Sequence, residues 1–271
     1  MSNSLSDWTT FGIGGEALQI SVARSIGALA ELSAEGLVLG NGSNVLVSDD
    51  GYDGNVVINR YEELVRFGRL VEVGSGMALP RLCAFLAENG LSGLEWAAGI
   101  PGTVGGAVVM NAGAFGGQTS DRLVYADVLR GGMVVRLGKD ELGFGYRTSG
   151  ISGADTVLCA AFELFDDSPG AIADKCRAYN RIRREKQPAG RSAGSIFKNP
   201  CGASVGAVLD RAGLKGLKKG GAQISQKHAN IIVNTGGASA RDVVYLISIM
   251  KAVLVDNGIE AQEEIRYIGG F

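Results

Sequence analysis

The sequence has one histidine, His228, and four cysteines, and this scarcity excludes several kinds of active site. Multi-histidine metal centres and histidine proton relays need more histidines than this chain has. The cysteines stand far apart without a C-x-x-C pair, so we predict no metal site and no thioredoxin-type site; they are Cys83, Cys159, Cys176 and Cys201. Separate reduced thiols are typical of a cytoplasmic protein.

Long apolar runs and a strong charge of one sign are also missing. No run reaches eighteen apolar residues, and the N-terminal sequence MSNSLSDWTT has neither the basic start nor the apolar stretch of a signal peptide. The formal net charge is −2, with both signs interspersed, which gives no basic surface for nucleic acid or for an anionic membrane. We therefore expect a cytoplasmic protein, a monomer, with small-molecule partners and with no nucleic-acid or membrane partner.

Glycine, by contrast, is abundant. It accounts for 42 of 271 residues, about twice its usual share, while there are only five prolines and no collagen-like period. Glycine without a repeat is expected where the backbone must pass close to another group.

Mixed strand and helix patterns in the first half of the chain predict an α+β fold. Strand-like runs occupy residues 37–40, 55–58 and 70–73. Apolar residues at helical spacing between positions 79 and 86 stop before Gly90, which is typical of a helix end.

The second half contains a predicted hairpin and two predicted helices. Two β-rich segments, residues 123–130 and 133–137, are separated by two glycines, the signature of a tight hairpin. One helix is expected to begin at Pro169, and another at Ser239, whose capping box is completed by Asp242.

The length of the chain and a change in its residue pattern after the middle predict two domains. We place the boundary near residue 165, which gives an N-terminal domain of residues 1–164 and a C-terminal domain of residues 165–271. The N-terminal domain is divided into subdomains of about residues 1–60 and 61–164.

The first glycine loop, V-L-G-N-G-S-N-V-L-V, spans residues 38–47. Gly40 and Gly42 expose backbone amides beside the polar side chains of Ser43 and Asn44, which is the chemistry of a diphosphate cradle. A third glycine is missing and a β-branched run follows, so the loop is neither a Rossmann fingerprint nor a P-loop. A plain turn between two strands is the alternative interpretation.

The second glycine-rich segment, residues 97–117, contains seven glycines and Pro101 within an apolar stretch. An apolar wall with accessible amides suits a buried cofactor. We favour such a loop over a glycine-kinked core helix, because small residues at this density leave little side chain to fill a core.

At these two loops the sequence resembles a known family. The loops are similar to the diphosphate-binding segments of vanillyl-alcohol-oxidase/PCMH-type FAD domains. Their residue sequence resembles that of the UDP-N-acetylenolpyruvoylglucosamine reductase family. Seven motifs in order carry the resemblance; they lie at residues 9–15, 39–47, 93–106, 145–149, 193–200, 227–234 and 264–269.

The resemblance implies an α+β fold, with a FAD-binding domain of two α+β subdomains and a smaller α+β substrate-binding domain. It also implies a reaction of peptidoglycan precursor synthesis, in which NADPH is the co-substrate and FAD the cofactor. UDP-N-acetylglucosamine enolpyruvate would be reduced to UDP-N-acetylmuramate.

Three catalytic residues are implied by matching motif positions. Arg147, in G-Y-R-T-S, would hold the substrate carboxylate; Ser195, in A-G-S-I-F-K-N-P, would protonate C2; and Glu264, in E-I-R-Y-I-G, would assist at the carboxylate. Charge that develops in a dry site needs such opposing groups. Without the motifs, the ordinary interpretations are a surface ion pair, a turn hydroxyl and a solvated carboxylate.

The resemblance also assigns binding residues. For the cofactor they are Gly40, Asn41, Gly42, Ser43, Asn44, Gly99, Ile100, Pro101, Gly102, Thr103, Gly105, Gly106, Ala112 and Arg183. For the substrate they are Lys186, Asn199, His228 and Asn230. The alternatives for two of the latter are a solvated lysine on a basic helix end and a histidine used in packing.

Two departures from the family pattern are visible. The chain resembles the shorter form of the family, which lacks a loop carrying a substrate-contacting tyrosine, and Gly12 stands where the family often has a basic residue. Another FAD-dependent oxidoreductase of the same fold, acting on a different alcohol or acid, is an alternative function. A nucleotide-binding protein without catalysis is another.

Overall fold

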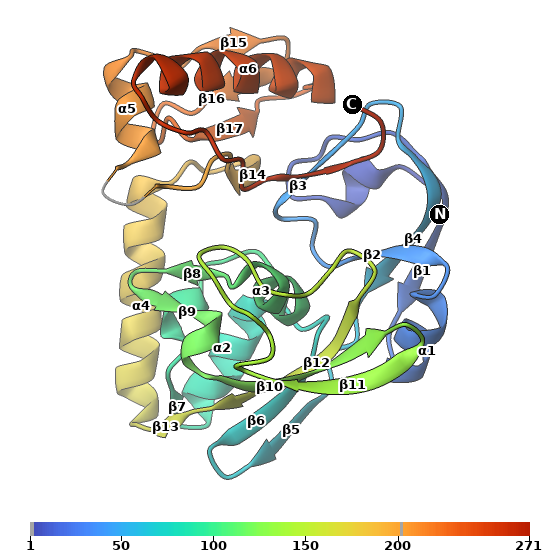
Figure 1. The fold of residues 1–271 in the computed structure, drawn as a ribbon. Coiled ribbons are helices and arrows are strands. Elements are labelled where there is room, and N and C mark those ends of the chain that lie inside the picture. The colour runs from blue at the N-terminus through green and yellow to red at the C-terminus, as the bar shows by residue number, and fades with distance from the viewer. Residues whose placement is uncertain (1–2, 201–202) are drawn as a thin grey trace. The chain divides into compact units, whose positions relative to one another are not determined.

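The computed structural model describes residues 3–200 and 203–271, whose contacts form two compact units (Figure 1). The central unit comprises residues 20–41 and 55–183, and the terminal unit comprises residues 1–19, 42–54 and 184–271. This grouping differs from the predicted division after residue 164. Helix α4 (Pro169–Lys186) packs Cys176 and Tyr179 against the central core, and Phe11 and Ile13 join the core of the terminal unit.

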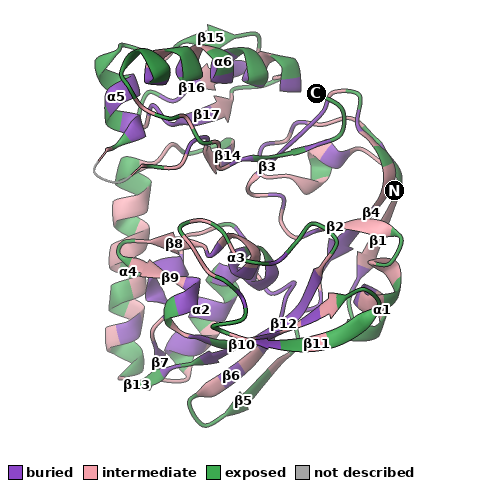
Figure 2. Ribbon diagram, viewed as in Figure 1, coloured by how far each residue is buried: buried purple, intermediate pink, exposed green. Residues whose placement is uncertain are grey.

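The central unit is built around a five-stranded antiparallel sheet. Its strands follow the order β11 (Met133–Gly138), β10 (Leu123–Arg130), β12 (Thr156–Glu163), β6 (Leu70–Gly74) and β5 (Leu64–Phe67). Strand β12 is buried over seven of its eight positions, because helices α1 (Ile26–Leu32) and α3 (Val104–Met110) pack against it. Figure 2 shows this buried strand in purple.

Smaller elements complete this part of the chain. A three-stranded sheet has the order β1 (Ala17–Ala23), β4 (Tyr52–Asn59) and β2 (Gly36–Leu39). Two-stranded pairs are formed by β7 (Leu91–Ser92) with β13 (Phe165–Asp166), and by β8 (Gly113–Ala114) with β9 (Gly117–Gln118). Helix α2 (Leu79–Glu88) and the 3-10 turns η2 (Glu95–Ala97) and η3 (Thr119–Asp121) lie between strands.

The terminal unit contains a four-stranded sheet covered by helices. The strand order is β14 (Arg191–Ser195), β17 (Ile231–Asn234), β16 (Ala222–Ile224) and β15 (Lys218–Lys219). Helix α6 (Ala240–Asp256) packs against β15 and β16, and α5 (Val205–Arg211) packs against α6. Strands β3 (Val45–Val47) and β18 (Arg266–Ile268) pair in parallel, and the 3-10 turn η1 (Leu5–Trp8) lies near the N-terminus.

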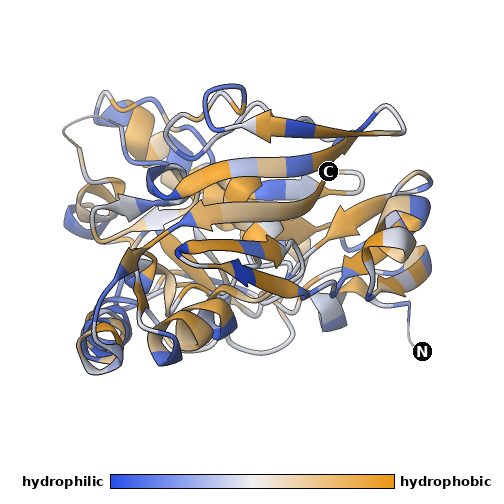
Figure 3. Cartoon of the chain, turned by 90° about the horizontal axis from the view of Figure 1, so that it is seen from below, coloured by the Kyte–Doolittle hydropathy of each residue, from blue (hydrophilic) through white to orange (hydrophobic). Residues whose placement is uncertain are grey.

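The predicted α+β class and most of the predicted local elements are confirmed. The hairpin pairs Arg130 with Met133, and both intervening glycines have positive φ, as a tight turn of this kind requires. Ser239 and Asp242 form the capping box at the start of α6. Figure 3 shows that the strands carry long hydrophobic stretches, which agrees with the runs from which they were predicted.

One expectation for the second glycine-rich segment is wrong, because its middle is helix α3 and not a loop. Thr103 caps this helix by accepting a hydrogen bond from Gly106 N, and Val104 and Val108 are fully buried. A Cβ atom on Gly105 would lie 2.9 Å from Cβ of Ser75. The small residues therefore allow close packing of a helix, and they do not prevent helix formation.

Three of the four cysteines lie within the described residues. Cys83 and Cys159 are buried and Cys176 is half-buried, and none of these three forms a disulfide, while Cys201 lies outside the described residues. Burial raises the pKa of the Cys159 thiol to about 12. No helix in residues 3–200 and 203–271 has the length and apolar character needed to cross a membrane.

Candidate active site

Within the central unit, the first residues of the two glycine segments lie side by side. The side-chain nitrogen of Asn41 donates to the carbonyl oxygen of Pro101 at 3.0 Å. A Cβ atom on Gly40 would collide with the hydroxyl of Thr103, so glycine is required for this approach. Nη1 of Arg60 donates to the carbonyl oxygen of Gly40 at 3.1 Å and fixes the peptide at this point. The first loop is thus held against the start of the second.

Arg183 stands beside the start of the second glycine segment. A Cβ atom on Gly99 would lie 2.8 Å from Cδ of Arg183 and 2.5 Å from Oδ1 of Asn180. Burial alone lowers the pKa of Arg183, and no carboxylate in the described part of the chain pairs with it. A half-buried guanidinium next to glycine backbone is suited to an anion.

Several predicted cofactor residues of the second segment have backbone partners inside the protein. The amide of Gly105 donates to Ser75 O at 2.8 Å, and the amide of Ile100 donates to Ala97 O at 2.9 Å. Gly102 O accepts from Leu79 N at 3.0 Å, and Ala112 N donates to Ala107 O at 2.9 Å. Of the predicted positions here, Pro101 and Gly106 are exposed. These bonds fix the shape of the segment and leave few amides for a ligand.

The rest of the first glycine loop belongs to the terminal unit. Gly42 has a φ of +57°, and its carbonyl accepts from Thr10 N at 3.2 Å. Ser43 is half-buried, and Asn44 donates from Nδ2 to the carbonyl oxygen of Glu264 at 2.9 Å. The loop is therefore tied to a predicted catalytic residue.

The structure brings the backbones of Ser195 and Glu264 together in the terminal unit. Ser195 is the last residue of β14, and the carbonyl of the next residue, Ile196, accepts from Glu264 N at 2.7 Å. Phe197 pairs with Glu263 in an isolated antiparallel bridge. Both Ser195 and Glu264 are half-buried, as a serine and a carboxylate facing a ligand would be.

Arg147 lies in the central unit, in a tight turn. It has a φ of +56°, a conformation that an L-residue with a large side chain rarely adopts, and its Nη2 donates to Gly113 O at 2.6 Å. Gly145 and Thr148 close the turn through mutual backbone hydrogen bonds. The grouping of this arginine with Ser195 and Glu264 stays a prediction.

The predicted substrate residues all lie in the terminal unit and differ in character. Lys186 is exposed at the end of α4, and Oδ1 of Asn199 accepts from Val205 N at 3.0 Å. Nδ1 of His228 accepts from Asn230 N at 3.3 Å, and burial lowers the pKa of this histidine. Asn230 is 1% exposed, and its side chain bonds both Phe197 N, at 3.0 Å, and Phe197 O, at 2.8 Å. Its amide therefore holds the segment after Ser195.

At Gly12, where the family often has a basic residue, the side chain of another residue supplies a guanidinium. A Cβ atom on Gly12 would lie 2.8 Å from both Cδ and Nη1 of Arg191, the first residue of β14. Gly12 has a φ of +63°, and Thr10 nearby donates from its hydroxyl to Ser192 O at 2.7 Å. A positive charge is thus present beside this position.

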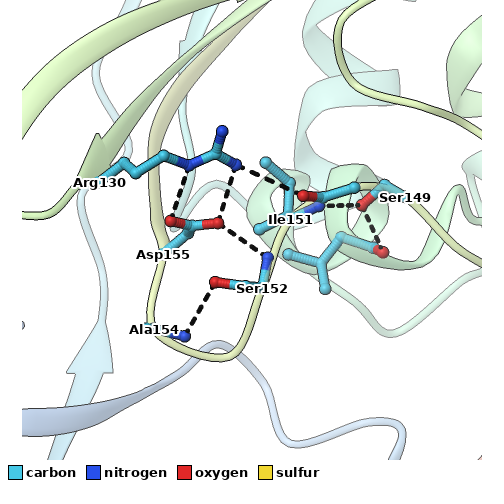
Figure 4. A network of polar contacts seen from close by, with 8 residues as sticks. Arg130, Ser149, Ile151, Ser152, Ala154 and Asp155 are labelled. Atoms are coloured by element: carbon cyan, nitrogen blue, oxygen red, sulfur yellow. Dashed lines mark hydrogen bonds and ion pairs between the residues drawn. The ribbon is translucent and has the colours of Figure 1, made fainter.

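Sequence reasoning missed three residues that shape the site. Arg60 holds Gly40; Asn111 ends α3 with a side chain that reaches the Arg147 turn; and Asp155 anchors the loop after that turn through Arg130 (Figure 4). An asparagine followed closely by glycine is a helix-end signal, which could have identified Asn111. The bonds of Arg60 to Gly40 and of Arg130 to Asp155 join residues 20 and 25 positions apart, so no local pattern reveals them.

The comparisons with known proteins agree with this geometry. A family model described as "UDP-N-acetylenolpyruvoylglucosamine reductase, C-terminal domain" matches residues 186–268, and one described as "FAD binding domain" matches residues 21–138. The chain is 39% identical to UDP-N-acetylenolpyruvoylglucosamine reductase of Rubrobacter xylanophilus, over 97% of this chain and 92% of that protein. For the same enzyme of Caldicellulosiruptor saccharolyticus the identity is 42%, over 98% and 91%.

A solved structure is similar over the whole chain as well. The crystal structure of the enzyme from Thermus caldophilus has a TM-score of 0.86 and 37% identity, and the match covers 98% of this chain and 97% of that one. Identity at this level over nearly the full length of each relative leaves no large part of the sequence unmatched. The chain belongs to the UDP-N-acetylenolpyruvoylglucosamine reductase family.

Proposed function

We propose that Ser195 is the proton donor and Arg147 the carboxylate-binding residue in the FAD-dependent reduction that this family carries out. The reaction converts the enolpyruvyl ether of UDP-N-acetylglucosamine to UDP-N-acetylmuramate for peptidoglycan synthesis, with NADPH as co-substrate. FAD, held by the residues of the glycine segments, would supply the hydride chemistry that links NADPH to C3 of the enolpyruvyl group. The residues of the chain must then stabilise charge at the carboxylate and supply a proton at C2.

The residues of the central unit fit the diphosphate of FAD. Gly40 and Asn41 lie against Pro101 and Thr103, where side chains larger than hydrogen at position 40 would collide. Arg183 places a half-buried cation beside Gly99 with no acid paired to it among the described residues. An anion at this place would compensate the cost of burying that charge. The other predicted cofactor residues would support the same contact through the shape of the loops.

Ser195 is suited to donate a proton because its segment is rigidly held. The carbonyl of Ile196 accepts from Glu264 N, and the side-chain amide of Asn230 bonds both Phe197 N and Phe197 O. A serine hydroxyl is a weak acid, so catalysis requires it to be aimed at C2 and not left to rotate freely. Glu264 would act at the neighbouring carboxylate as a hydrogen-bonding acid.

Arg147 is suited to the substrate carboxylate because a guanidinium is planar and offers paired donors. Its φ of +56° is costly by about 1–3 kcal/mol for a non-glycine residue, and such strain concentrates at functional sites. Removing this arginine should therefore slow the reoxidation of the flavin by the enolpyruvyl substrate, while cofactor binding should change less.

Substrate binding is assigned to the terminal unit through Lys186, Asn199 and His228, which would meet the diphosphate and uridine. We propose that Asn230 acts indirectly, because its amide is fully used by Phe197. We propose that residues 1–164 form the FAD-binding domain, to which Arg183 adds a contact, and that residues 165–271 form the substrate-binding domain, to which Arg147 adds a contact. The family-model matches at residues 21–138 and 186–268 support it. We further propose that the enzyme is a monomer of the cytoplasm, where NADPH and UDP-linked sugars are made.

The backbone hydrogen bond from Glu264 N to the carbonyl of Ile196, the neighbour of Ser195, is the observation that carries this proposal, since it joins the motifs of Ser195 and Glu264, which are 69 positions apart. The test is anaerobic stopped-flow measurement of Ser195→Ala. We expect flavin reduction by NADPH at the wild-type rate, and reoxidation by the enolpyruvyl substrate slower by about 10²–10⁴-fold. Equal slowing of both halves would contradict the role of Ser195 as proton donor.

A further inference from the structure

Three non-glycine residues in the described part of the chain have positive φ, and two of them are connected. They are Asn111, Phe115 and Arg147, with φ of 41°, 54° and 56°. Such conformations persist only where surrounding contacts hold them. Asn111 and Arg147 belong to the same hydrogen-bonded cluster of the central unit, although they are far apart in sequence.

Asn111 is the residue on which this cluster is centred. It ends helix α3 in the left-handed conformation and is 2% exposed. Its Oδ1 accepts from Ser120 N at 3.0 Å, and its Nδ2 donates to Gly145 O at 2.9 Å and to Gln118 Oε1 at 3.3 Å. The Gly145 bond reaches the first residue of the G-Y-R-T-S turn.

The chemistry of these partners requires an amide at position 111. A backbone N–H needs an acceptor and a carbonyl needs a donor, and in an amide side chain these are the oxygen and the nitrogen, so Oδ1 must face Ser120 and Nδ2 must face Gly145. An aspartate would keep the bond from Ser120 and tolerate the left-handed backbone. It would, however, set a carboxylate oxygen against the carbonyl of Gly145.

The arginine of the turn is held by Gly113, two residues after Asn111. Nη2 of Arg147 donates to Gly113 O at 2.6 Å, and a Cβ atom on Gly113 would lie 3.1 Å from Nη1 of Arg147. Residues 111–113 therefore bond the turn at two points, the carbonyl of Gly145 and the guanidinium of Arg147. Both contacts together fix the direction of the arginine.

We infer that Asn111 is a positioning residue for Arg147. Its amide holds the strained turn so that the guanidinium is presented in one orientation, which catalysis requires but cofactor binding does not. This inference rests on the proposed role of Arg147 at the substrate carboxylate. Asn111 itself is not assigned a contact with substrate or FAD.

The test compares Asn111→Asp with Asn89→Asp as a matched control in the full-length flavin-loaded enzyme. Asn89 also caps a helix C-terminus, α2, and donates from Nδ2 to Phe85 O at 2.8 Å, far from the turn in sequence. For Asn111→Asp we expect flavin reduction by NADPH within about twofold of wild type and substrate-dependent reoxidation slower by about 10²-fold. Asn89→Asp should change neither rate. Asn111→Gly, which accepts the positive φ without strain, should behave like Asn111→Asp.

A double mutant separates this inference from the proposed function. Arg147→Met alone should slow reoxidation, and adding Asn111→Asp should slow it by no more than about a further twofold, because both changes remove one interaction. Wild-type reoxidation in both Asn111 variants, multiplicative effects, or loss of bound flavin in both would overturn the positioning role. Wild-type reoxidation in Arg147→Met would instead refute the proposed role of Arg147.

Discussion

The side chain of Asn44 donates to the backbone carbonyl of Glu264 at 2.9 Å, and so joins two motifs from opposite ends of the chain. The parallel pairing of β3 and β18 continues from this point, beginning with Val45 and Arg266. Arg266 N also donates to Asn44 O at 3.0 Å. The conformation of the first glycine loop and the position of Glu264 are therefore coupled.

Asn44→Ala should uncouple the first glycine loop from Glu264. Loss of one hydrogen bond should lower the free energy of unfolding by about 0.5–1.5 kcal/mol, and the freed Glu264 peptide should slow reoxidation by substrate more than reduction by NADPH. The control is Asn257→Ala, which removes an exposed bond of similar type to Val253 O, 2.8 Å long, at the end of α6. Chemical denaturation and the two half-reactions measure the effects. An Asn44 variant with unchanged kinetics in both halves would refute the coupling.

Local elements of the fold could be predicted because their determinants are neighbours in sequence. The paired glycines at positions 131 and 132 and the Ser239 capping box act over two or three residues. The helix α3 was not predicted, because Gly105 and Gly106 are poor helix formers in isolation and the close contact of Gly105 with Ser75 is visible only in the tertiary structure.

For the candidate site, motif resemblance alone suggests Ser195, Glu264 and Arg147, and their roles stay predictions. No local pattern reveals that Asn111 reaches Gly145 or that Arg60 holds Gly40. These contacts depend on the tertiary fold. For the same reason the sequence suggested Asn230 as a ligand contact, while its burial and its two bonds to Phe197 indicate a structural clamp.

Arg191 should be interchangeable with a basic residue at position 12. In Arg191→Ala the guanidinium beside Gly12 is lost, and flavin or substrate binding should weaken by about tenfold or more, as for one charge-assisted hydrogen bond. Gly12→Arg in that background should restore part of the affinity, despite about 1–2 kcal/mol of strain from positive φ. Gly12→Arg in the wild-type background should destabilise the enzyme more than in the Arg191→Ala background, because there the new side chain collides with Arg191. Binding titrations of the three variants check this; no loss in Arg191→Ala would refute it.

Asp155 should make the stability of the protein depend on acid pH. Its side chain is 5% exposed, and it receives two bonds from Arg130 and one from Ser152 N (Figure 4). The Arg130 hydrogen bonds are the main cause that lowers the pKa of Asp155 from 3.8 to about 2. A carboxyl whose pKa is lower in the folded state contributes stability above the unfolded pKa, and this contribution is lost as the pH falls through the folded value.

The expected result for Asp155→Asn is a loss of about 1–2 kcal/mol near neutral pH, a range that allows for solvent screening of the half-exposed Arg130. The difference from wild type should be constant above about pH 5 and should shrink between pH 4 and pH 2, where wild-type Asp155 also becomes neutral. Asp174→Asn is the control, because its ion pair with Arg177 is 72% exposed at the aspartate and should contribute little. Denaturant unfolding at several pH values measures both. A difference that persists unchanged at pH 2 would show that Asp155 stabilises the fold by packing and not by its charge.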